Sequence, residues 1–210
     1  MEEFEKIIGY TFKNREYLEV ALTHSSYANE HHVKCNERLE FLGDSVLSLV
    51  VSESLFKTLK MNEGDLSKTR ASLVCENGLF ELSKKINLSK YLRLGKGEEI
   101  GGGRTRPALV SDAFEALIAA IFLDSDFETA KKWLLSIMKE ELETAGDSMD
   151  FGDYKTMLQE YTQKGNHGKV NYYIVSESGP DHDKSFVCAV AVDGKTIAEG
   201  SGKTKKEAEQ

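Results

Sequence analysis

The sequence predicts two domains, an all-α domain over residues 1–146 and a small α+β domain over residues 153–210. A chain of 210 residues has room for one or two domains. Apolar residues recur at helical spacing through the first two thirds of the chain, where the alternation typical of strands is almost absent. The stretch from Thr144 to Asp153 is small, polar and glycine-containing, and strand patterns begin only after it. This composition predicts a linker over residues 147–152.

Helical periodicity defines the elements of the first domain. Between residues 39 and 56, apolar side chains repeat at intervals of three and four, which places them on one face of a helix. The same spacing predicts helices over residues 69–86, 112–123 and 130–142. The glycine-rich run from Gly95 to Pro107 predicts an irregular loop between two of these helices.

The second domain is predicted to have the order helix, strand, strand, strand, helix. One helical run and three strand runs follow one another, over residues 153–164, 170–175, 185–192 and 195–199. Asp193 and Gly194 separate the last two strands, and this dipeptide between two apolar runs predicts a tight hairpin. Thr204 and Glu207 have the spacing of a capping box that opens a final helix. The chain ends about two turns later, so we expect this helix to be cut short.

The net charge of −8 limits how the chain could attract a polyanion. Residues 149–210 hold eight lysines against ten acidic side chains, and the rest of the chain is acidic too. Binding of nucleic acid would therefore depend on local clusters of lysine, or on metal ions that neutralise carboxylates. Three cysteines without a C-x-x-C pair argue against a disulfide framework and against a zinc site built on thiolates.

No segment of the sequence is suited to cross a membrane. The longest uninterrupted apolar stretch, residues 116–123, is far shorter than the ~20 residues that a spanning helix needs. The N-terminus is acidic, whereas a secretory signal peptide begins with basic residues. We therefore expect a cytoplasmic protein without a membrane partner.

A first group of acidic candidates lies in the segment Asn36–Ser45. Glu37, Glu40 and Asp44 are spaced i, i+3 and i+7, so one face of the predicted helix carries all three carboxylates. Carboxylates this close repel one another. Gly43 in the same helix costs up to ~1 kcal/mol relative to alanine, which is consistent with the close approach of another backbone. The alternative interpretation of the segment is a solvated acidic face.

Asp112 and Glu115 form a second acidic group, at the start of a strongly apolar helix. The helix dipole alone would favour acids in a first turn. Taken with the first group, however, four carboxylates on two helices could meet at one point. Oxygen ligands suit Mg²⁺ or Mn²⁺, and a pair of such ions can clamp the attacking and leaving oxygens in phosphodiester hydrolysis. The residues themselves leave open both a metal site and two solvated faces.

Polar residues at three places in the second domain could contact nucleic acid. Gln159 and Gln163, at i and i+4, share one face of the first helix. His182 lies in the turn Gly179–Lys184 between the first two strands. Lysines gather at the start of the last helix, at Lys203, Lys205 and Lys206. Such separated groups suit A-form RNA, whose wide minor groove displays 2′-hydroxyls, while a solvated basic cap is the alternative for the lysines.

The segment Asn36–Ser45, Asn-Glu-Arg-Leu-Glu-Phe-Leu-Gly-Asp-Ser, resembles the ten-residue signature of the ribonuclease III family. Further blocks resemble other motifs of that family in the expected order, at Leu22–Tyr27, Gly102–Arg104 and Asp112–Asp124. Residues 153–210 resemble a double-stranded-RNA-binding domain. The resemblance covers nearly the whole chain, with the two-domain layout of the simple bacterial enzyme.

The resemblance implies a Mg²⁺-dependent endoribonuclease that hydrolyses double-stranded RNA as a homodimer, with Mn²⁺ as a substitute ion. Family products carry 5′-phosphates and 3′-hydroxyls with short 3′ overhangs, and arise in the processing of ribosomal RNA precursors and other structured transcripts. The positions that match the family's metal ligands are Glu40, Asp44, Asp112 and Glu115. Among these the resemblance assigns catalysis to Asp44 and Glu115, and it gives supporting roles to Glu37 and Glu63.

Two other function classes compete with this interpretation. A non-cleaving double-stranded-RNA-binding protein on the same fold would be expected to have lost its acids, whereas all four are present here. An acidic helical interaction module would leave the lysines of the second domain without a purpose. The four retained carboxylates therefore favour the enzyme.

Overall fold

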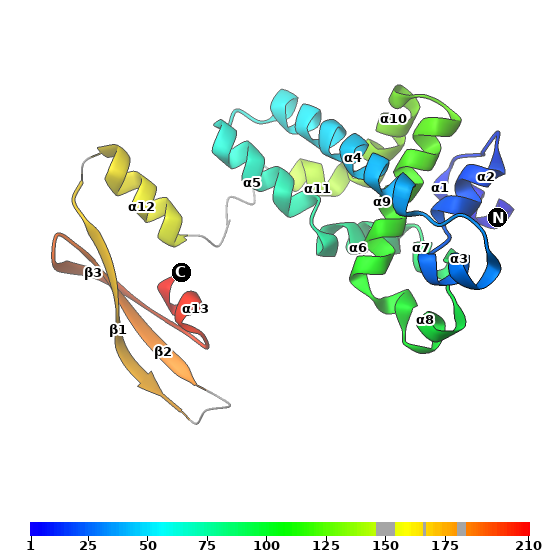
Figure 1. Ribbon diagram of the computed structural model, residues 1–210. Helices are drawn as coiled ribbons and strands as arrows, with labels where there is room; N and C mark the ends of the chain where they lie inside the picture. Colours follow the sequence, from blue (N-terminus) through cyan, green and yellow to red (C-terminus); the bar gives the residue numbers. More distant parts are fainter. Residues whose placement is uncertain (146–153, 166, 180–183) are drawn as a thin grey trace. The chain divides into compact units, whose positions relative to one another are not determined.

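The computed structural model describes residues 1–145, 154–165, 167–179 and 184–210, in two compact units, Met1–Asp147 and Ser148–Gln210 (Figure 1). The first unit is helical, and the second holds an antiparallel three-stranded sheet with one helix before it and one after it in sequence. The predicted fold class is therefore confirmed. The linker predicted over residues 147–152 lies outside the described residues, so the domain boundaries stay a prediction.

The helices of the first unit follow one another with short connections. They are α1 (Glu2–Ile8), α2 (Arg15–Ala21), α3 (Ser25–His31), α4 (Glu37–Thr58), α5 (Glu63–Leu73), α6 (Glu76–Lys85), α7 (Leu88–Tyr91), α8 (Lys96–Ile100), the 3-10 helix η1 (Gly103–Thr105), α9 (Pro107–Asp124), α10 (Phe127–Ile137) and α11 (Lys139–Thr144).

Helix α9 is the centre of this unit. It packs against α2, α4, α6 and α10, and twelve of its 18 residues are buried. A helix that is apolar on nearly every side is stable only inside a core. Pro107 suits its first position, because proline lacks the N–H group that would be unsatisfied there. The second long helix, α4, buries one stripe, including Leu39, Val46 and Val50, as the sequence predicted.

Two of the predicted helices are each divided in two by the structure. Residues 69–86 were expected to form one helix, but α5 ends at Leu73 and α6 begins at Glu76. Cys75 between them has an extended backbone, and its sulfur accepts the N–H of Gly78 and caps α6. Residues 130–142 are divided in the same way at Met138, where α10 ends. Apolar periodicity continues across such breaks, so the pattern alone could not locate them.

The prediction of an irregular loop from Gly95 to Pro107 is wrong in part, because α8 and η1 lie within it. Arg104 holds this region together. Its guanidinium pairs with the Glu99 carboxylate, at 2.6 Å and 2.7 Å, and donates to the carbonyl oxygens of Ser89 and Lys90. These long-range contacts stabilise two short helices that local glycine content disfavours.

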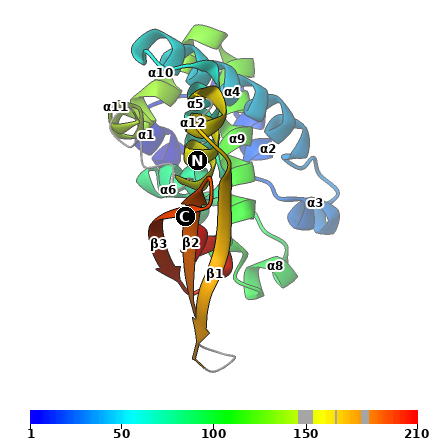
Figure 2. The ribbon, with the colours of Figure 1, turned by 90° about the vertical axis from the view of Figure 1, so that its left-hand side faces the viewer.

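The second unit contains α12 (Tyr154–Gly165), the strands β1 (Val170–Ser178), β2 (Ser185–Val192) and β3 (Lys195–Gly202), and the short α13 (Lys205–Glu209). Figure 2 shows the strands side by side with β2 in the middle, the order that the hydrogen bonds define. The predicted hairpin at Asp193 and Gly194 is confirmed. Both residues have positive φ, of 49° and 80°, as a type I′ turn requires.

The small core of this unit lies between the sheet and α13. Phe186 and Cys188 of β2 are buried there against Ala208, with Tyr172 packed beside them. Thr204 accepts the N–H of Glu207, and the Glu207 carboxylate accepts the N–H of Lys203, so the predicted capping box forms in a slightly shifted version. Among the described residues, no helix combines the length and the apolar character needed to span a membrane.

One buried carboxylate ties the N-terminal segment of the first unit to the end of α9. Asp124 accepts hydrogen bonds from the Tyr10 hydroxyl (2.8 Å) and from the backbone N–H groups of Lys13 (2.8 Å) and Asn14 (2.7 Å). Burial raises the pKa of Asp124, but these hydrogen bonds together outweigh burial and bring the pKa below its usual value. The ionised carboxylate is thus the form that holds the segment.

Asp124→Asn should therefore lower the free energy of unfolding by about 1–3 kcal/mol, because the amide cannot accept all three hydrogen bonds. The loss should be full at neutral pH and should shrink as the pH falls, since the contribution of a carboxylate with a lowered pKa disappears on protonation. Urea unfolding at several pH values measures both effects. The exposed Glu128, changed to Gln, is the control for loss of one charge. An unchanged unfolding midpoint for Asp124→Asn would contradict the assignment.

Candidate metal centre

The start of α4 is fixed by the backbone. Asn36, the residue before the helix, is buried; its N–H donates to the Thr23 carbonyl (2.9 Å), and its own carbonyl accepts the N–H of Glu40 (2.9 Å). The first turn of α4 is therefore held at a defined place beside the core. Glu40 projects from this turn.

Helices α4 and α9 touch at their backbones where Gly43 passes Glu115. A Cβ atom at Gly43 would lie 1.9 Å from the carbonyl oxygen of Glu115, far inside any contact that real Cβ atoms show. Only glycine allows this approach, which explains the unfavourable residue inside a helix. The close approach predicted from the sequence is confirmed. It sets Glu40 on one helix directly across from the acids of the other.

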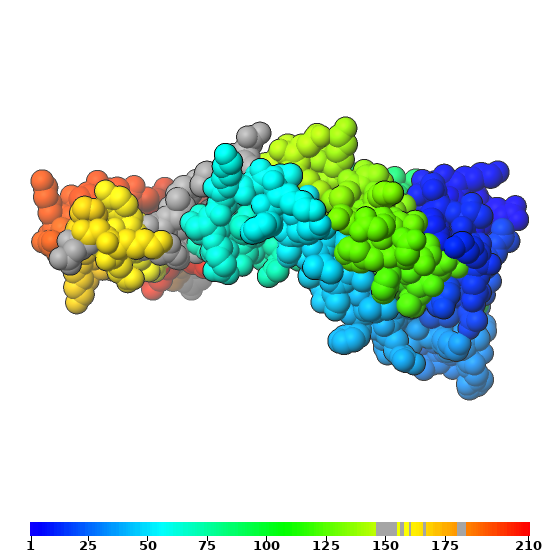
Figure 3. All heavy atoms as spheres, turned by 90° about the horizontal axis from the view of Figure 1, so that it is seen from above, coloured from blue at the N-terminus to red at the C-terminus, as the bar shows by residue number. Residues whose placement is uncertain are grey.

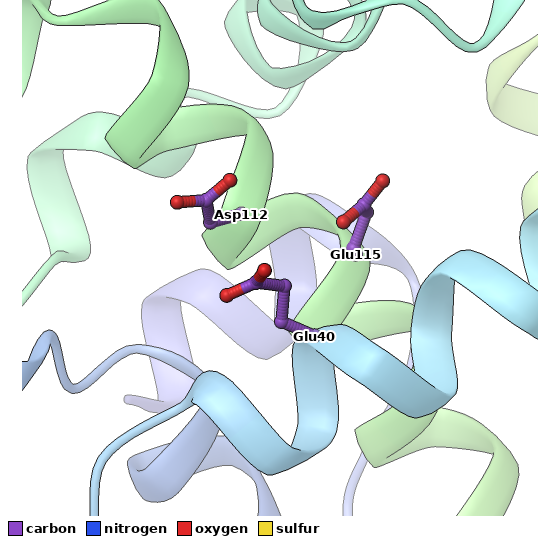
Figure 4. A group of neighbouring side chains, drawn as sticks. All are labelled: Glu40, Asp112 and Glu115. Atoms are coloured by element: carbon purple, nitrogen blue, oxygen red, sulfur yellow. The ribbon is translucent and has the colours of Figure 1, made fainter.

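Three carboxylates meet at this crossing. Figure 4 shows Asp112 and Glu115 on α9 and Glu40 on α4 with their side chains directed into one shared space. Oxygen atoms of all three lie within 4.8 Å of one another, and each side chain is half-buried. Asp112 and Glu115 occupy two of the few positions of α9 that the core does not bury.

The electrostatics of the group show mutual repulsion in a poorly solvated place. Burial raises the pKa of Glu115 to about 7, and the charges of Asp44, Asp112 and Glu40 add to this shift. Burial also raises the pKa of Glu40, with further contributions from Asp112, Glu37 and Asp44. The three acids would therefore release their protons more readily with a cation between them.

The other acids of α4 lie at the edge of this group. Asp44 is exposed, and its carboxylate is outside the three that gather within 4.8 Å, but after burial it is the charge that raises the pKa of Glu115 most. Glu37 is exposed as well, and its charge acts on Glu40. Both could approach a bound ion through water.

Glu63 does not join the cluster of its own chain. It begins α5, where its carboxylate accepts the Ser67 hydroxyl (3.0 Å). Helix α4 separates it from Glu40, because Thr58, at the end of α4, lies 18 positions after Glu40, which corresponds to about 27 Å along the helix. The family resemblance implies a supporting role for Glu63, which the geometry within one chain does not provide.

Two residues near the cluster were not identified from the sequence as part of it. The charge of Glu76, at the start of α6, adds to the rise that burial causes in the pKa of Asp112, and a positive charge on His24 would oppose that rise. Neither has a sequence spacing that relates it to Asp112. Only the folded chain brings them there: α6 packs against α9, and the backbone N–H of His24 is bonded to Arg93.

The donor set suits a hard divalent cation. It consists of carboxylate oxygens alone, the ligands that Mg²⁺ and Mn²⁺ prefer. Glu40, Asp112 and Glu115 would hold the ion, and its charge would offset the burial and the repulsion that raise their pKa values.

The second unit gathers some of the predicted RNA-binding residues. Gln159 and Gln163 line one surface depression together with Lys169, next to the start of β1. The three lysines around α13 are all exposed: Lys203, Lys205 and Lys206. His182 lies outside the described residues.

Comparison with known proteins identifies both units. A family model described as ribonuclease-III-like matches residues 14–142, and a double-stranded RNA binding motif matches residues 154–210. The chain is 48% identical to ribonuclease 3 of Listeria innocua over 213 aligned positions, which cover 100% of this chain and 93% of that protein. The chain belongs to the ribonuclease III family. The predicted family and the prediction of an endoribonuclease are thereby confirmed.

Other relatives agree with this membership. The chain is 49% identical to ribonuclease 3 of Caldanaerobacter subterraneus, with 98% of this chain and 92% of that protein aligned. A solved structure of the nuclease domain of ribonuclease III from Campylobacter jejuni is similar in fold, with a TM-score of 0.63 and 44% identity. The match covers 67% of this chain and 96% of that domain.

Binding of Mg²⁺ to the three-carboxylate cluster should depend on pH. In the metal-free protein the raised pKa of Glu115, about 7, means that the folded state keeps a proton that the unfolded chain releases at lower pH. The stability due to this group is therefore lost as the pH rises towards about 7, and Mg²⁺ must displace the proton below that pH. We expect Mg²⁺ to raise the melting temperature more at about pH 8 than at about pH 6.

Thermal unfolding with and without Mg²⁺ at the two pH values measures this difference. In Glu115→Gln the group that titrates near neutral pH is gone, so the variant should show a smaller Mg²⁺ effect with little dependence on pH. Equal shifts at both pH values in the parent protein would mean that Glu115 does not exchange its proton for the ion.

Proposed function

We propose that this protein is a Mg²⁺-dependent endoribonuclease that hydrolyses double-stranded RNA, with Mn²⁺ as a substitute ion. The observation that carries the proposal is the meeting of Glu40, Asp112 and Glu115 at the crossing of α4 and α9. This carboxylate centre stands in a chain whose second unit matches a double-stranded RNA binding motif. An acidic centre of this kind has no affinity for RNA until cations occupy it, and the second unit supplies attraction that needs no metal.

The proposed roles follow from where the side chains lie. Glu40, Asp112 and Glu115 hold the ion, while Asp44 and Glu37 at the rim orient water around it. The bound ion would polarise the phosphate and stabilise the charge that develops during hydrolysis. Asp44 and Glu115 are the residues that we assign to catalysis, because after burial the charge of Asp44 on α4 raises the pKa of Glu115 on α9 most.

The proposed reaction breaks the bond between phosphorus and the 3′ oxygen. Water forms the new bond to phosphorus, and the leaving oxygen takes a proton, so the products carry a 5′-phosphate and a 3′-hydroxyl. We propose that Glu115, whose pKa burial raises to about 7 in the metal-free state, and Asp44, whose charge acts on it, orient that water.

The change Glu115→Gln keeps the size of the side chain and removes one charge, so cleavage should fall by about 100-fold or more. The variant should still fold, because the substitution removes a negative charge that neighbouring carboxylates repel. A gel assay on a long RNA duplex with Mg²⁺ measures the rate, and duplex binding without Mg²⁺ should remain. Glu128→Gln, an exposed acid on α10, is the matched control. Cleavage by Glu115→Gln within a few-fold of the parent would overturn the assignment.

We further propose that the enzyme acts as a homodimer through α4. Phe41, Leu49 and Phe56 are 78%, 57% and 76% exposed and lie on one face of that helix. Leu42, next to Phe41 in sequence, is half-buried against the chain's own core and lies outside this face. Leu66 of α5 lines a depression beside Leu49 and Phe56, and the second half of α4 and α5 are at the surface in Figure 3. The solved structure of the Campylobacter jejuni nuclease domain is described as showing structural flexibility in the region involved in dimer formation.

The spacing of this apolar face fits a two-fold axis. Leu49 lies midway between Phe41 and Phe56, so an antiparallel pairing centred on Leu49 places Phe41 against the second half of the other α4. A surface depression there is lined by apolar residues that could receive it: Leu49, Leu55, Phe56, Met61 and Leu66.

This pairing would also give Glu63 a role. It lies just past the C-terminal end of α4, so in the proposed dimer it approaches the other chain's Glu37, at the start of the paired helix. The supporting role of both residues would then be exerted between chains. Two centres related by the axis would cut both strands of a duplex at offset positions, which would leave short 3′ overhangs.

Leu49→Asp should convert the dimer to a monomer, because the axis would bring two like charges together in an apolar surface. Sedimentation at micromolar concentration measures the mass. Ile100→Asp places the same charge at an apolar side chain that is 88% exposed on α8, away from the proposed interface, and should remain dimeric. A parent protein that sediments as a monomer would contradict the proposal, as would a dimeric Leu49→Asp variant.

The second unit is proposed to hold the RNA backbone through the predicted contacts. These are Gln159, Gln163, His182, Lys203, Lys205 and Lys206. The depression that Gln159 and Gln163 share with Lys169 supports a contact on α12, and the exposed lysines around α13 support a separate one. Amides can read 2′-hydroxyls, while lysines bind phosphates without regard to sequence.

Changing Lys203, Lys205 and Lys206 to Ala should weaken duplex binding equally for different sequences. The slope of log affinity against log salt should flatten by up to about three units, on the guide of roughly 0.9 for each phosphate that is no longer bound. Binding titrations without Mg²⁺ at several salt concentrations measure it. Changing Lys6, Lys84 and Lys90 of the first unit makes the same change in net charge and is the control. An unchanged slope in the first triple variant would rule out the lysine contact.

The biological setting is proposed from the same chemistry. Paired RNA regions cut at both strands occur in ribosomal RNA precursors and other structured transcripts, which we propose as substrates. In a bacterial cell these are made in the cytoplasm, which is where we expect this enzyme to act.

A further inference from the structure

The segment Leu22–Tyr27 has no role in the function proposed so far, although part of it lies beside the carboxylate centre. The N–H of His24 donates to the carbonyl of Arg93 (3.1 Å), and the Thr23 carbonyl accepts the N–H of Asn36 (2.9 Å). Asn36 in turn accepts the N–H of Glu40. The residue before His24, Thr23, is thus hydrogen-bonded to Asn36 at the start of α4. The first turn of this helix carries the proposed metal ligand Glu40.

Hydrogen bonds fix which ring nitrogen of His24 carries the proton. The Nδ1 atom accepts the N–H of Ser26 at 3.2 Å and lies 2.8 Å from the Ser26 hydroxyl. Because Nδ1 accepts the N–H of Ser26, the hydroxyl must donate its own proton to Nδ1, while its oxygen accepts the N–H of Gly95 at 2.9 Å. A nitrogen that accepts in this way has no proton, and the neutral ring must carry its proton on Nε2.

The Nε2–H group remains available to a ligand. His24 is half-buried, and among the residues that the structure describes none accepts a hydrogen bond from Nε2. The ring lies within electrostatic reach of Asp112, because a positive charge on it would lower the pKa of that carboxyl group. A rigid, unpaired donor therefore lies at the margin of the carboxylate centre.

We propose that His24 is a substrate-binding residue of this centre, whose neutral imidazole donates its Nε2–H to a phosphate oxygen of the RNA strand next to the carboxylates. This rests on the proposed function. A neutral donor suits the position, because a lysine or arginine there would pair with Asp112 and compete with the metal ion. The Nδ1 contacts orient the ring before RNA arrives, so little entropy is lost when the phosphate binds.

The competing explanation is that His24 is only the cap of α3. Its Nδ1 accepts the N–H of the second helical residue, as a capping side chain does. Cap and donor use different nitrogens, so two substitutions separate them. Asparagine places an acceptor where Nδ1 is but has no group at Nε2. Glutamine places an N–H donor near Nε2 but does not reproduce the cap.

The test therefore compares His24→Asn and His24→Gln in the whole two-domain chain with a long RNA duplex. His24→Asn should keep the parent's melting temperature and its binding of duplex without Mg²⁺, yet its kcat should fall by about 10- to 100-fold, the range for a missing hydrogen bond to a charged group. His24→Gln should melt at a lower temperature and still cleave faster than His24→Asn. His24→Asn should thus be the more stable variant and His24→Gln the more active one. A purely structural role of His24 would rank the two variants in the same order in both properties.

Three outcomes overturn the inference. They are a His24→Asn variant that cleaves within about threefold of the parent, a His24→Gln variant that is folded at the assay temperature but no faster than His24→Asn, and a loss that follows melting temperature in both. Failure of the proposed function itself would look different, because the parent protein would then leave the duplex uncut with Mg²⁺ present.

Discussion

The direct backbone contact between Gly43 and Glu115 is the constraint on which the site depends. A single Cβ atom at Gly43 would collide with the Glu115 carbonyl at 1.9 Å, so any other residue would move α4 away from α9. Carboxylates can bind one ion together only when their oxygen atoms lie within a few ångströms of one another. A small shift between the helices would therefore separate Glu40 from Asp112 and Glu115. The unfavourable glycine inside α4 is thus the condition for Glu40 to meet Asp112 and Glu115.

The core and the site are in tension at the same place. Helix α9 is buried almost throughout, and this burial is what raises the pKa of Glu115 to about 7 and the pKa values of Asp112 and Glu40 as well. Carboxylates in such a position destabilise the metal-free fold at neutral pH and bind a cation more strongly for the same reason. The buried apolar side chains of α9, including Phe114 and Ile118, therefore contribute to the affinity of the carboxylates for a cation.

The sequence predicts the acids of the site better than it predicts their surroundings. Regular spacing identifies Glu40, Asp112 and Glu115, and the signature segment relates them, because helix geometry converts spacing into position. The break at Cys75 and the helices between Gly95 and Pro107 depend on caps and on distant contacts such as those of Arg104, which no local pattern contains. Glu63 carries the charge that the resemblance implies, but it lies at the start of α5, beyond the C-terminal end of α4, and so far from Glu40 in the same chain.

His24 shows the same limit in a functional residue. It lies in the segment Leu22–Tyr27, which resembles a family motif, but its place beside the centre arises only because the carbonyl of Thr23 is bonded to Asn36, while Ser26, held by Gly95, orients the ring. A centre made of carboxylates must attract a polyanion, and it can do so in two ways. The bound cation supplies charge, while a neutral donor supplies direction without competing for the carboxylates. Because a neutral donor changes no net charge and needs no special spacing, neither composition nor periodicity could indicate it, and only the hydrogen bonds of the folded chain do.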